Sequence, residues 1–129
     1  MNRIVELELA GNKYPLNFSL SAAESFTERF GGLEKIADQF SKQTTVESMR
    51  NIKYMLAVLI REGLKYRKIQ GETATEIPSF ELLQEEIGTL LGIADIENLI
   101  PIIMGTFGKG SERTIETENN SKNAETTQG

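Results

Sequence analysis

The segment from Val46 to Lys68, VESMRNIKYMLAVLIREGLKYRK, decides how this chain folds. Apolar residues recur through it at helical spacing, and from Tyr54 to Ile60 it is hydrophobic on nearly every side. This pattern predicts one long helix whose middle is covered by other elements of the protein. The run is too short to cross a bilayer, because charged residues interrupt it on both sides, at Arg50, Lys53, Arg61 and Glu62.

The two ends of this segment carry helix-terminating signals. Thr44 and Glu47 have the spacing of a capping box, in which each side chain accepts a hydrogen bond from the other residue's backbone N–H. The carboxyl end is cationic, which offsets the negative pole of the helix, and Gly71 follows as a stop signal. We therefore expect a single helix between these signals.

Residues 4–18 predict a β-hairpin, because apolar and polar side chains alternate in two runs on either side of Gly11 and Asn12. Folding about these two residues pairs the apolar side chains on one face, with Leu9 opposite Tyr14, Leu7 opposite Leu16 and Val5 opposite Phe18.

Pro15 restricts the turn of this hairpin, since proline has no N–H to donate to the neighbouring strand. A two-residue turn at Gly11 and Asn12 would place it opposite Glu8 in a hydrogen-bonded pair. A four-residue loop from Ala10 to Lys13 places Pro15 at a non-hydrogen-bonded position. We favour the wider loop, or an edge strand with its proline side outward.

Residues 21–107 predict a cluster of about five helices. Ser21 and Glu24 form a second capping-box pattern, and this helix should end at Gly31 and Gly32. A short helix should follow. Its core-facing residues would be Leu33, Ile36, Ala37 and Phe40.

Two more helices complete the cluster. Ser79 is the expected cap of a helix through Leu91, and Asp95 is the expected cap of a last helix that ends near Phe107. Pro101 predicts a kink in that last helix or a true start near Ile100. The inward side chains of the first of these helices would be Phe80, Leu83, Ile87, Leu90 and Leu91.

These elements predict an α+β protein in which an N-terminal hairpin packs on a mainly α-helical cluster. The length of 129 residues suits one domain, which we place at residues 1–108. Residues 109–129 are rich in Ser, Thr, Asn, Glu and Gln and predict a flexible polar tail.

The composition excludes several kinds of chemistry. The chain has no histidine and no cysteine, so disulfides, thiolate nucleophiles, imidazole bases and the usual zinc sites are excluded. We expect no cofactor, no metal and no catalysis. The amino terminus lacks an apolar signal-peptide core, so no membrane anchor is expected and a cytoplasm is the default compartment.

Other polar motifs fit solvated surface better than catalysis. Neighbouring helical carboxylates at Glu85 and Glu86 point in different directions, and Glu6 and Glu8 lie on the polar face of the hairpin. The segment from Gly105 to Gly110 lacks the strand and the serine spacing of a phosphate loop, so it predicts a flexible helix exit.

The basic run from Lys65 to Lys68 supports an alternative function, a small regulatory nucleic-acid-binding protein. A net charge of −5 disfavours it, because phosphate neutralisation supplies most of the affinity for duplexes. The simpler interpretation is a helix end that uses cations to offset its dipole.

The last helix carries more apolar residues than one core-facing stripe needs. Surplus apolar surface at a chain end predicts a contact with another chain or with a second copy, although completion of the core explains it equally well. The candidate partner-binding residues are Leu99, Ile102, Ile103, Met104 and Phe107.

The hairpin also carries a family resemblance. Its pattern is apolar-x-apolar-x-G-x-x-Y-x-apolar-x-F, here Leu7 to Phe18, followed by a helix with a late aromatic residue and glycine, Phe26 to Gly31, and then a long apolar helix. Over residues 4–108 this order resembles the tail assembly chaperones of bacteriophages with long noncontractile tails, particularly those of Gram-positive hosts.

The resemblance implies a small, acidic, non-enzymatic phage or prophage protein. It would coat the tape measure protein, keep its apolar surface soluble and recruit tail tube subunits in the host cytoplasm, and it would be absent from the mature virion. Many members also have a longer form produced by a programmed ribosomal frameshift. The runner-up to this function is a nucleic-acid-binding regulator or a generic protein-interaction module of a prophage.

Overall fold

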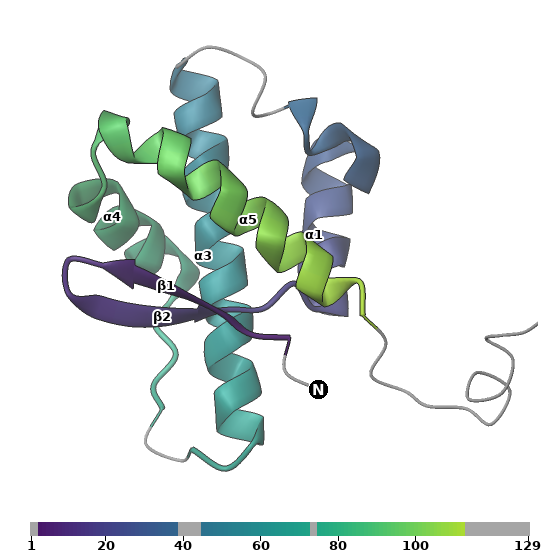
Figure 1. Ribbon diagram of the computed structural model, residues 1–129, viewed down its shortest axis with the longest axis vertical. Helices are drawn as coiled ribbons and strands as arrows, with labels where there is room; N and C mark the ends of the chain where they lie inside the picture. Colours follow the sequence, from purple (N-terminus) through teal and green to yellow (C-terminus); the bar gives the residue numbers. More distant parts are fainter. Residues whose placement is uncertain (1–2, 39–44, 73–74, 113–129) are drawn as a thin grey trace, which may run out of the picture.

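A computed structural model describes residues 3–38, 45–72 and 75–112 of the chain. In these ranges an antiparallel hairpin of two strands is followed by four α-helices and two short 3-10 turns, which confirms the predicted α+β class (Figure 1). The elements are β1 (Val5–Leu9), β2 (Asn12–Leu16), α1 (Leu20–Phe30), η1 (Leu33–Lys35), α3 (Val46–Ile69), α4 (Phe80–Leu90), η2 (Ile93–Asp95) and α5 (Ile96–Gly110).

Helix α3 is the centre of the protein. It runs through the middle of the molecule, with α1 on one side, α4 and the hairpin on the other, and α5 crossing in front (Figure 1). All six residues from Met55 to Ile60 are buried, as the hydrophobic run predicts. A helix of 24 residues is about 36 Å long, so it can contact every other element along its length.

The amino-terminal cap of α3 lies one residue later than predicted. Thr45 Oγ1 accepts a hydrogen bond from the Ser48 N–H at 3.0 Å, and Ser48 Oγ accepts one from the Thr45 N–H at 2.9 Å. The pairing of Thr44 with Glu47 was therefore wrong, because Ser48 supplies the reciprocal acceptor and Glu47 is exposed. Thr44 lies outside the described residues.

The hairpin forms, but in a register two residues away from the predicted one. Leu7 lies opposite Tyr14, and Val5 lies opposite Leu16. The connection is a two-residue turn at Ala10 and Gly11, whose φ angles of 51° and 85° are the signature of a type I′ turn. A shift of two residues keeps the same side chains on the buried face, since strands have a period of two.

The observed register also solves the problem posed by Pro15. The pair that closes the turn, Leu9–Asn12, is hydrogen-bonded, and from there non-hydrogen-bonded and hydrogen-bonded pairs alternate along the strands. The Glu6–Pro15 pair lies three steps beyond the closing pair. Pro15 therefore sits at a non-hydrogen-bonded position without the four-residue loop that the sequence favoured. The absence of an N–H on Pro15 therefore removes no hydrogen bond between the strands.

Strand β2 and the residues after it lie directly on α3. The Asn17 N–H donates to the Leu59 carbonyl oxygen at 3.1 Å. A Cβ atom added at Gly63 would collide with the Pro15 carbonyl group, so the strand approaches the helix backbone more closely than any side chain would permit. Gly63 thus sets the distance between the hairpin and the central helix.

Helix α1 begins at a different cap from the predicted one. Ser19 Oγ accepts from the Ala22 N–H at 3.1 Å and donates to Glu62 Oε1 of α3 at 2.7 Å. The Ser21–Glu24 box was wrong, because Ser19 has a tertiary partner that fixes it as the cap, while Ser21 is exposed in the first turn. The predicted end is confirmed, with Gly31 in the left-handed region at φ 89°.

Helix α4 confirms its predicted cap, since Ser79 Oγ accepts from the Leu82 N–H at 3.2 Å. Leu83 and Ile87 are buried as expected, but Leu90 is 41% exposed, so its inward placement was wrong. The short helix expected after Gly32 is described only as η1. There Ile36 is buried while Leu33 and Ala37 are exposed, and Phe40 lies outside the described residues.

Helix α5 begins directly after Asp95, as predicted, but ends later than predicted. Asp95 Oδ2 accepts from the Gly92 N–H at 2.7 Å, so this carboxylate closes η2 and makes no hydrogen bond to the start of α5. Of the two predicted starts, the one after Asp95 is observed and the one near Ile100 is not: the helix begins at Ile96 and continues through Pro101 to Gly110. The flexible exit predicted from Gly105 was wrong, because Gly110 packs against Phe18: a Cβ there would lie 2.5 Å from the Phe18 carbonyl oxygen.

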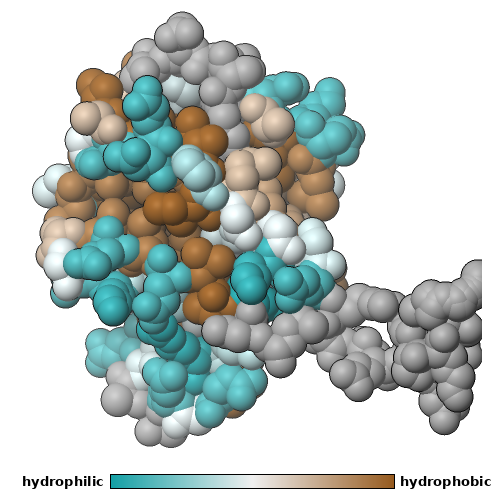
Figure 2. Space-filling model, viewed as in Figure 1, coloured by the Kyte–Doolittle hydropathy of each residue, from teal (hydrophilic) through white to brown (hydrophobic). Residues whose placement is uncertain are grey.

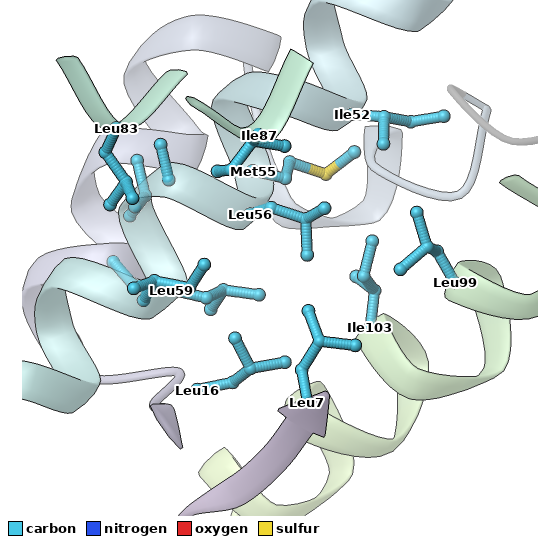
Figure 3. Close-up of a cluster of buried hydrophobic side chains, with 14 of the residues drawn as sticks. Leu7, Leu16, Ile52, Met55, Leu56, Leu59, Leu83, Ile87, Leu99 and Ile103 are labelled. Atoms are coloured by element: carbon cyan, nitrogen blue, oxygen red, sulfur yellow. The ribbon is translucent and has the colours of Figure 1, made fainter. Parts of the chain in front are cut away.

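One hydrophobic core joins the hairpin and the four described α-helices. Figure 3 shows side chains from the hairpin, α3, α4 and α5 pointing toward a common centre. The labelled residues are Leu7, Leu16, Ile52, Met55, Leu56, Leu59, Leu83, Ile87, Leu99 and Ile103, all of which belong to the buried cluster. This continuity makes the described part of residues 1–108 a single packed unit, extended by the last turn of α5.

We predict that Gly63→Ala lowers the free energy of unfolding by about 1–3 kcal/mol, because the added methyl group would push β2 away from α3. Alanine is intrinsically the better helix former by about 1 kcal/mol, so a loss of stability would isolate the steric effect. Urea denaturation of the two proteins measures it. The control is Gly105→Ala in α5, where no atom lies within 4 Å of an added Cβ and stability should rise. Equal gains from both substitutions would contradict the close approach.

Candidate partner-binding site

The structure separates the five predicted partner-binding residues into three groups. Leu99 is 3% exposed and Ile103 is fully buried, so both belong to the core and cannot contact another chain without unfolding. Ile102 and Phe107 are partly buried against the core. Met104, at 43% exposure, is the member of the set whose side chain reaches the surface.

Phe107 is held in an aromatic cluster that fixes the end of α5. Its ring centroid lies 4.5 Å from that of Phe18 and 5.9 Å from that of Phe26. Phe26 continues the cluster to Tyr54 of α3, at 6.1 Å, and Tyr54 meets Phe80 of α4 at 5.4 Å. These contacts give Phe107 a structural role, and they leave the other end of α5 as the place for a partner surface.

An apolar groove lies at that other end, where the first half of α3 meets the end of α4 and the start of α5. We call it the α3–α4–α5 groove. Its volume is about 340 Å³. The lining residues are Met49, Ile52, Lys53, Ile87, Gly88, Leu91, Gly92, Ile93 and Ile96.

The side chains of the groove differ in how far they are held by the core. Ile52 and Ile87 are buried and form its floor. Met49, Leu91 and Ile96 are partly buried, while Ile93 on the rim is 68% exposed. Unbranched methionine adapts to different partner shapes, and an isoleucine this exposed gains little from the fold itself. The groove is therefore apolar surface that remains available for binding.

Apolar residues are also concentrated on one part of the molecular surface. Figure 2 shows hydrophobic residues gathered over α4 and the first turns of α5, whereas hydrophilic residues cover the end of α3. Leu90 and Met104 add to the exposed apolar residues of these two helices. Contiguous apolar surface of this kind typically marks a protein interaction site.

One cation lies in the groove, and a glycine makes room for it. A Cβ atom added at Gly88 would lie 3.0 Å from Lys53 Cδ and 3.4 Å from Lys53 Nζ, so the lysine stem extends over the bare backbone of α4. Within the described residues, the Lys53 ammonium has no ion-pair or hydrogen-bond partner. The groove thus combines apolar walls with a single unneutralised positive charge.

Sequence patterns alone miss most of this site. They assign no binding role to Met49 or Gly88 and identify Lys53 only as a charge that interrupts the apolar run of the central helix. Gly88 is the available signal, because a glycine inside the otherwise regular α4 segment weakens the helix and calls for a packing or functional reason. Its position opposite Lys53 cannot be read without the packing of α4 on α3.

The basic run from Lys65 to Lys68 is partly neutralised by the protein's own carboxylates. Lys65 Nζ pairs with Glu62 Oε2 at 3.2 Å, and Arg67 Nη2 pairs with Glu6 Oε2 at 3.1 Å. The second pair links α3 to β1. Two of the three cations therefore already have acidic partners, which weakens the case for a phosphate-binding patch.

The described residues hold neither a metal cluster nor a single membrane-spanning helix. No group of three or more metal-ligating side chains is present among them. No single described helix is long and apolar enough to cross a membrane; the bent pair formed by α4 and residues 93–110 meets the length and composition criteria only when joined across a 97° bend.

Comparison with known proteins adds no identification, because no protein-family model, curated protein sequence or solved structure matches this chain.

We predict a large loss of stability at one position of α5 and almost none at its neighbour. Ile103→Ala should lower the free energy of unfolding by about 2–5 kcal/mol, because it leaves a cavity in the core. Met104→Gln keeps the length and helix propensity of an exposed side chain and should change stability by less than about 0.5 kcal/mol. Chemical denaturation checks both values. A large loss at Met104 would show that this residue belongs to the core.

Proposed function

We propose that this protein is a tail assembly chaperone of a bacteriophage or prophage with a long noncontractile tail. In this role it binds the tape measure protein, shields its apolar surface and recruits tail tube subunits, without catalysis. It acts in the cytoplasm of the infected or lysogenic bacterium and is absent from the finished virion. The observation that carries the proposal is the open apolar groove on a protein with the hairpin-then-helix order of that family.

Two properties of the groove support a holding function. The floor belongs to the core, whereas Met49 and Ile93 on the walls are free to repack around different side chains. A chaperone for a long helix has to accept many similar apolar stretches, so adaptable surface suits it better than a rigid pocket. Helix-in-groove binding is a recurrent way to cover the apolar face of an amphipathic helix.

The charge of the protein supports the same function. A formal net charge of −5 keeps the chaperone in solution while its groove is empty and disfavours binding to nucleic acid in the cytoplasm. The ion pairs of Lys65 and Arg67 act in the same direction, since they reduce the free cationic surface at the end of α3. The alternative of a nucleic-acid-binding regulator is correspondingly less supported.

The test is co-expression with the tape measure protein of the phage or prophage that carries this gene. We expect the soluble fraction of the tape measure protein to rise when the chaperone is present, and the two proteins to co-purify. Ile93→Glu should abolish this effect, because it places a carboxylate on the apolar rim of the groove without disturbing the core. The matched control is Ile69→Glu, a similarly exposed isoleucine at the end of α3 outside the groove. If the tape measure protein stays insoluble with the wild-type chain, the proposed function is wrong.

A filter-binding experiment against salt concentration distinguishes the nucleic-acid alternative. We expect no binding of duplex DNA or single-stranded RNA at physiological salt, because the chain is acidic and two cations of its basic run are paired. Binding that weakens steeply with salt and is lost in Lys68→Glu would support the regulator instead.

A further inference from the structure

Lys53 gives the α3–α4–α5 groove a chemical preference that its apolar walls alone would not have. The residue is partly buried, its ammonium group lies beside Gly88, and it lacks an acidic partner among the described residues. When a partner covers the groove, this charge loses water. A carboxylate on the partner would compensate the loss, whereas a cation or an apolar group would not.

We propose that the groove binds an amphipathic helix from another protein whose apolar ridge carries a flanking Asp or Glu, and that this carboxylate pairs with Lys53. The ridge would pack against Met49 of α3, Ile93 of η2 and Ile96 of α5. Apolar burial would supply most of the affinity, and the ion pair would determine the direction in which the bound helix runs along the groove. The inference rests on the proposed function in one respect, that the protein binds a helical partner.

Charge also decides between another protein and a second copy as the occupant. Self-association through the groove would bring together two chains of formal net charge −5, so their overall repulsion opposes it. A heterologous helix with one carboxylate for Lys53 and few other acidic residues meets no such repulsion. We therefore assign the groove to another protein.

Gly88 has a specific part in this arrangement. Glycine inside an exposed helix lowers helix stability relative to alanine, and here it provides the space over which the Lys53 stem lies. A larger residue would push the lysine aside and fill the groove. Because the atoms it meets belong to a flexible, partly exposed side chain, the protein would still fold.

The experiment uses three synthetic peptides of about 18 residues, long enough to form a helix on binding. Each has leucines at i, i+3, i+4 and i+7 spacing, and they differ only at one position flanking the ridge, which is Glu, Gln or Lys. Binding to the full chain is measured by fluorescence anisotropy. We expect the Glu peptide to bind tightest and the Lys peptide weakest, with about a fivefold difference between them, as a partly desolvated ion pair would give.

Two variants, each with a matched control, test the residues. Lys53→Glu should reverse the order of the peptides, while Lys68→Glu, an exposed lysine of the same helix outside the groove, should leave the order unchanged. Gly88→Leu should weaken all three peptides at least about tenfold by filling the groove. Gly105→Leu is its control, since it adds the same side chain to an open helical position. If both leucine variants unfold at or above the wild-type unfolding temperature, the loss of binding is not caused by unfolding of the protein.

Equal affinity for the three peptides, no binding of any of them, or insensitivity to Gly88→Leu would overturn the proposal. Concentration-dependent dimerisation in sedimentation equilibrium that Gly88→Leu abolishes would assign the groove to a second copy and would also overturn it. The proposed function fails separately: the peptide order can hold while the tape measure protein stays insoluble. Conversely, solubilisation that no groove variant affects would leave the function standing and remove this inference.

Discussion

The close contact between β2 and α3 at Gly63 is the constraint on which the rest of the structure depends. The Pro15 carbonyl group lies where a side chain at this position would be, and the Asn17 N–H donates to the α3 carbonyl of Leu59. This close main-chain contact holds the hairpin against the core, so that Leu7 and Leu16 contact the side chains of α3. The hairpin alone would be marginal, since two strands without a packing partner are rarely stable.

The packing of β2 on α3 also determines which residue caps the next helix, α1. The chain leaves β2 beside α3, which brings Ser19 within hydrogen-bond distance of Glu62 and starts α1 at Leu20. Phe18 then lies under the end of α5, where it meets Phe107 and the backbone of Gly110. One close approach thus orients two further helices, and α5 is anchored at its carboxyl end.

The anchoring of α5 at that end explains why apolar surface remains at its beginning. Leu99 and Ile103 fill the core, and the aromatic cluster holds Phe107, so the helix cannot also close over the first half of α3. The short η2 turn, closed by Asp95 on Gly92, carries Ile93 away from the core. The result is a groove whose floor is buried and whose rim is exposed, an arrangement suited to binding helices that vary in sequence.

The amino-acid sequence by itself determined the α+β class, the position of the central helix, the caps at Ser79 and Gly31, and the face of the hairpin that is buried. These features depend on local periodicity and on residues with strong backbone preferences, which act within a few positions of one another. The absence of histidine and cysteine likewise excludes their chemistry, whatever the arrangement of the chain in space.

Only the tertiary structure decided the register of the hairpin, the cap at Ser19, and the division of α5 into buried and exposed residues. Two registers that differ by two residues bury the same side chains, so the pattern could not distinguish them; the Ala10–Gly11 turn and the contact with Gly63 do. The groove depends in the same way on residues from three helices. Lys53 and Gly88 are 35 positions apart in the sequence, and only the packing of α4 on α3 brings the charge and the space for it together.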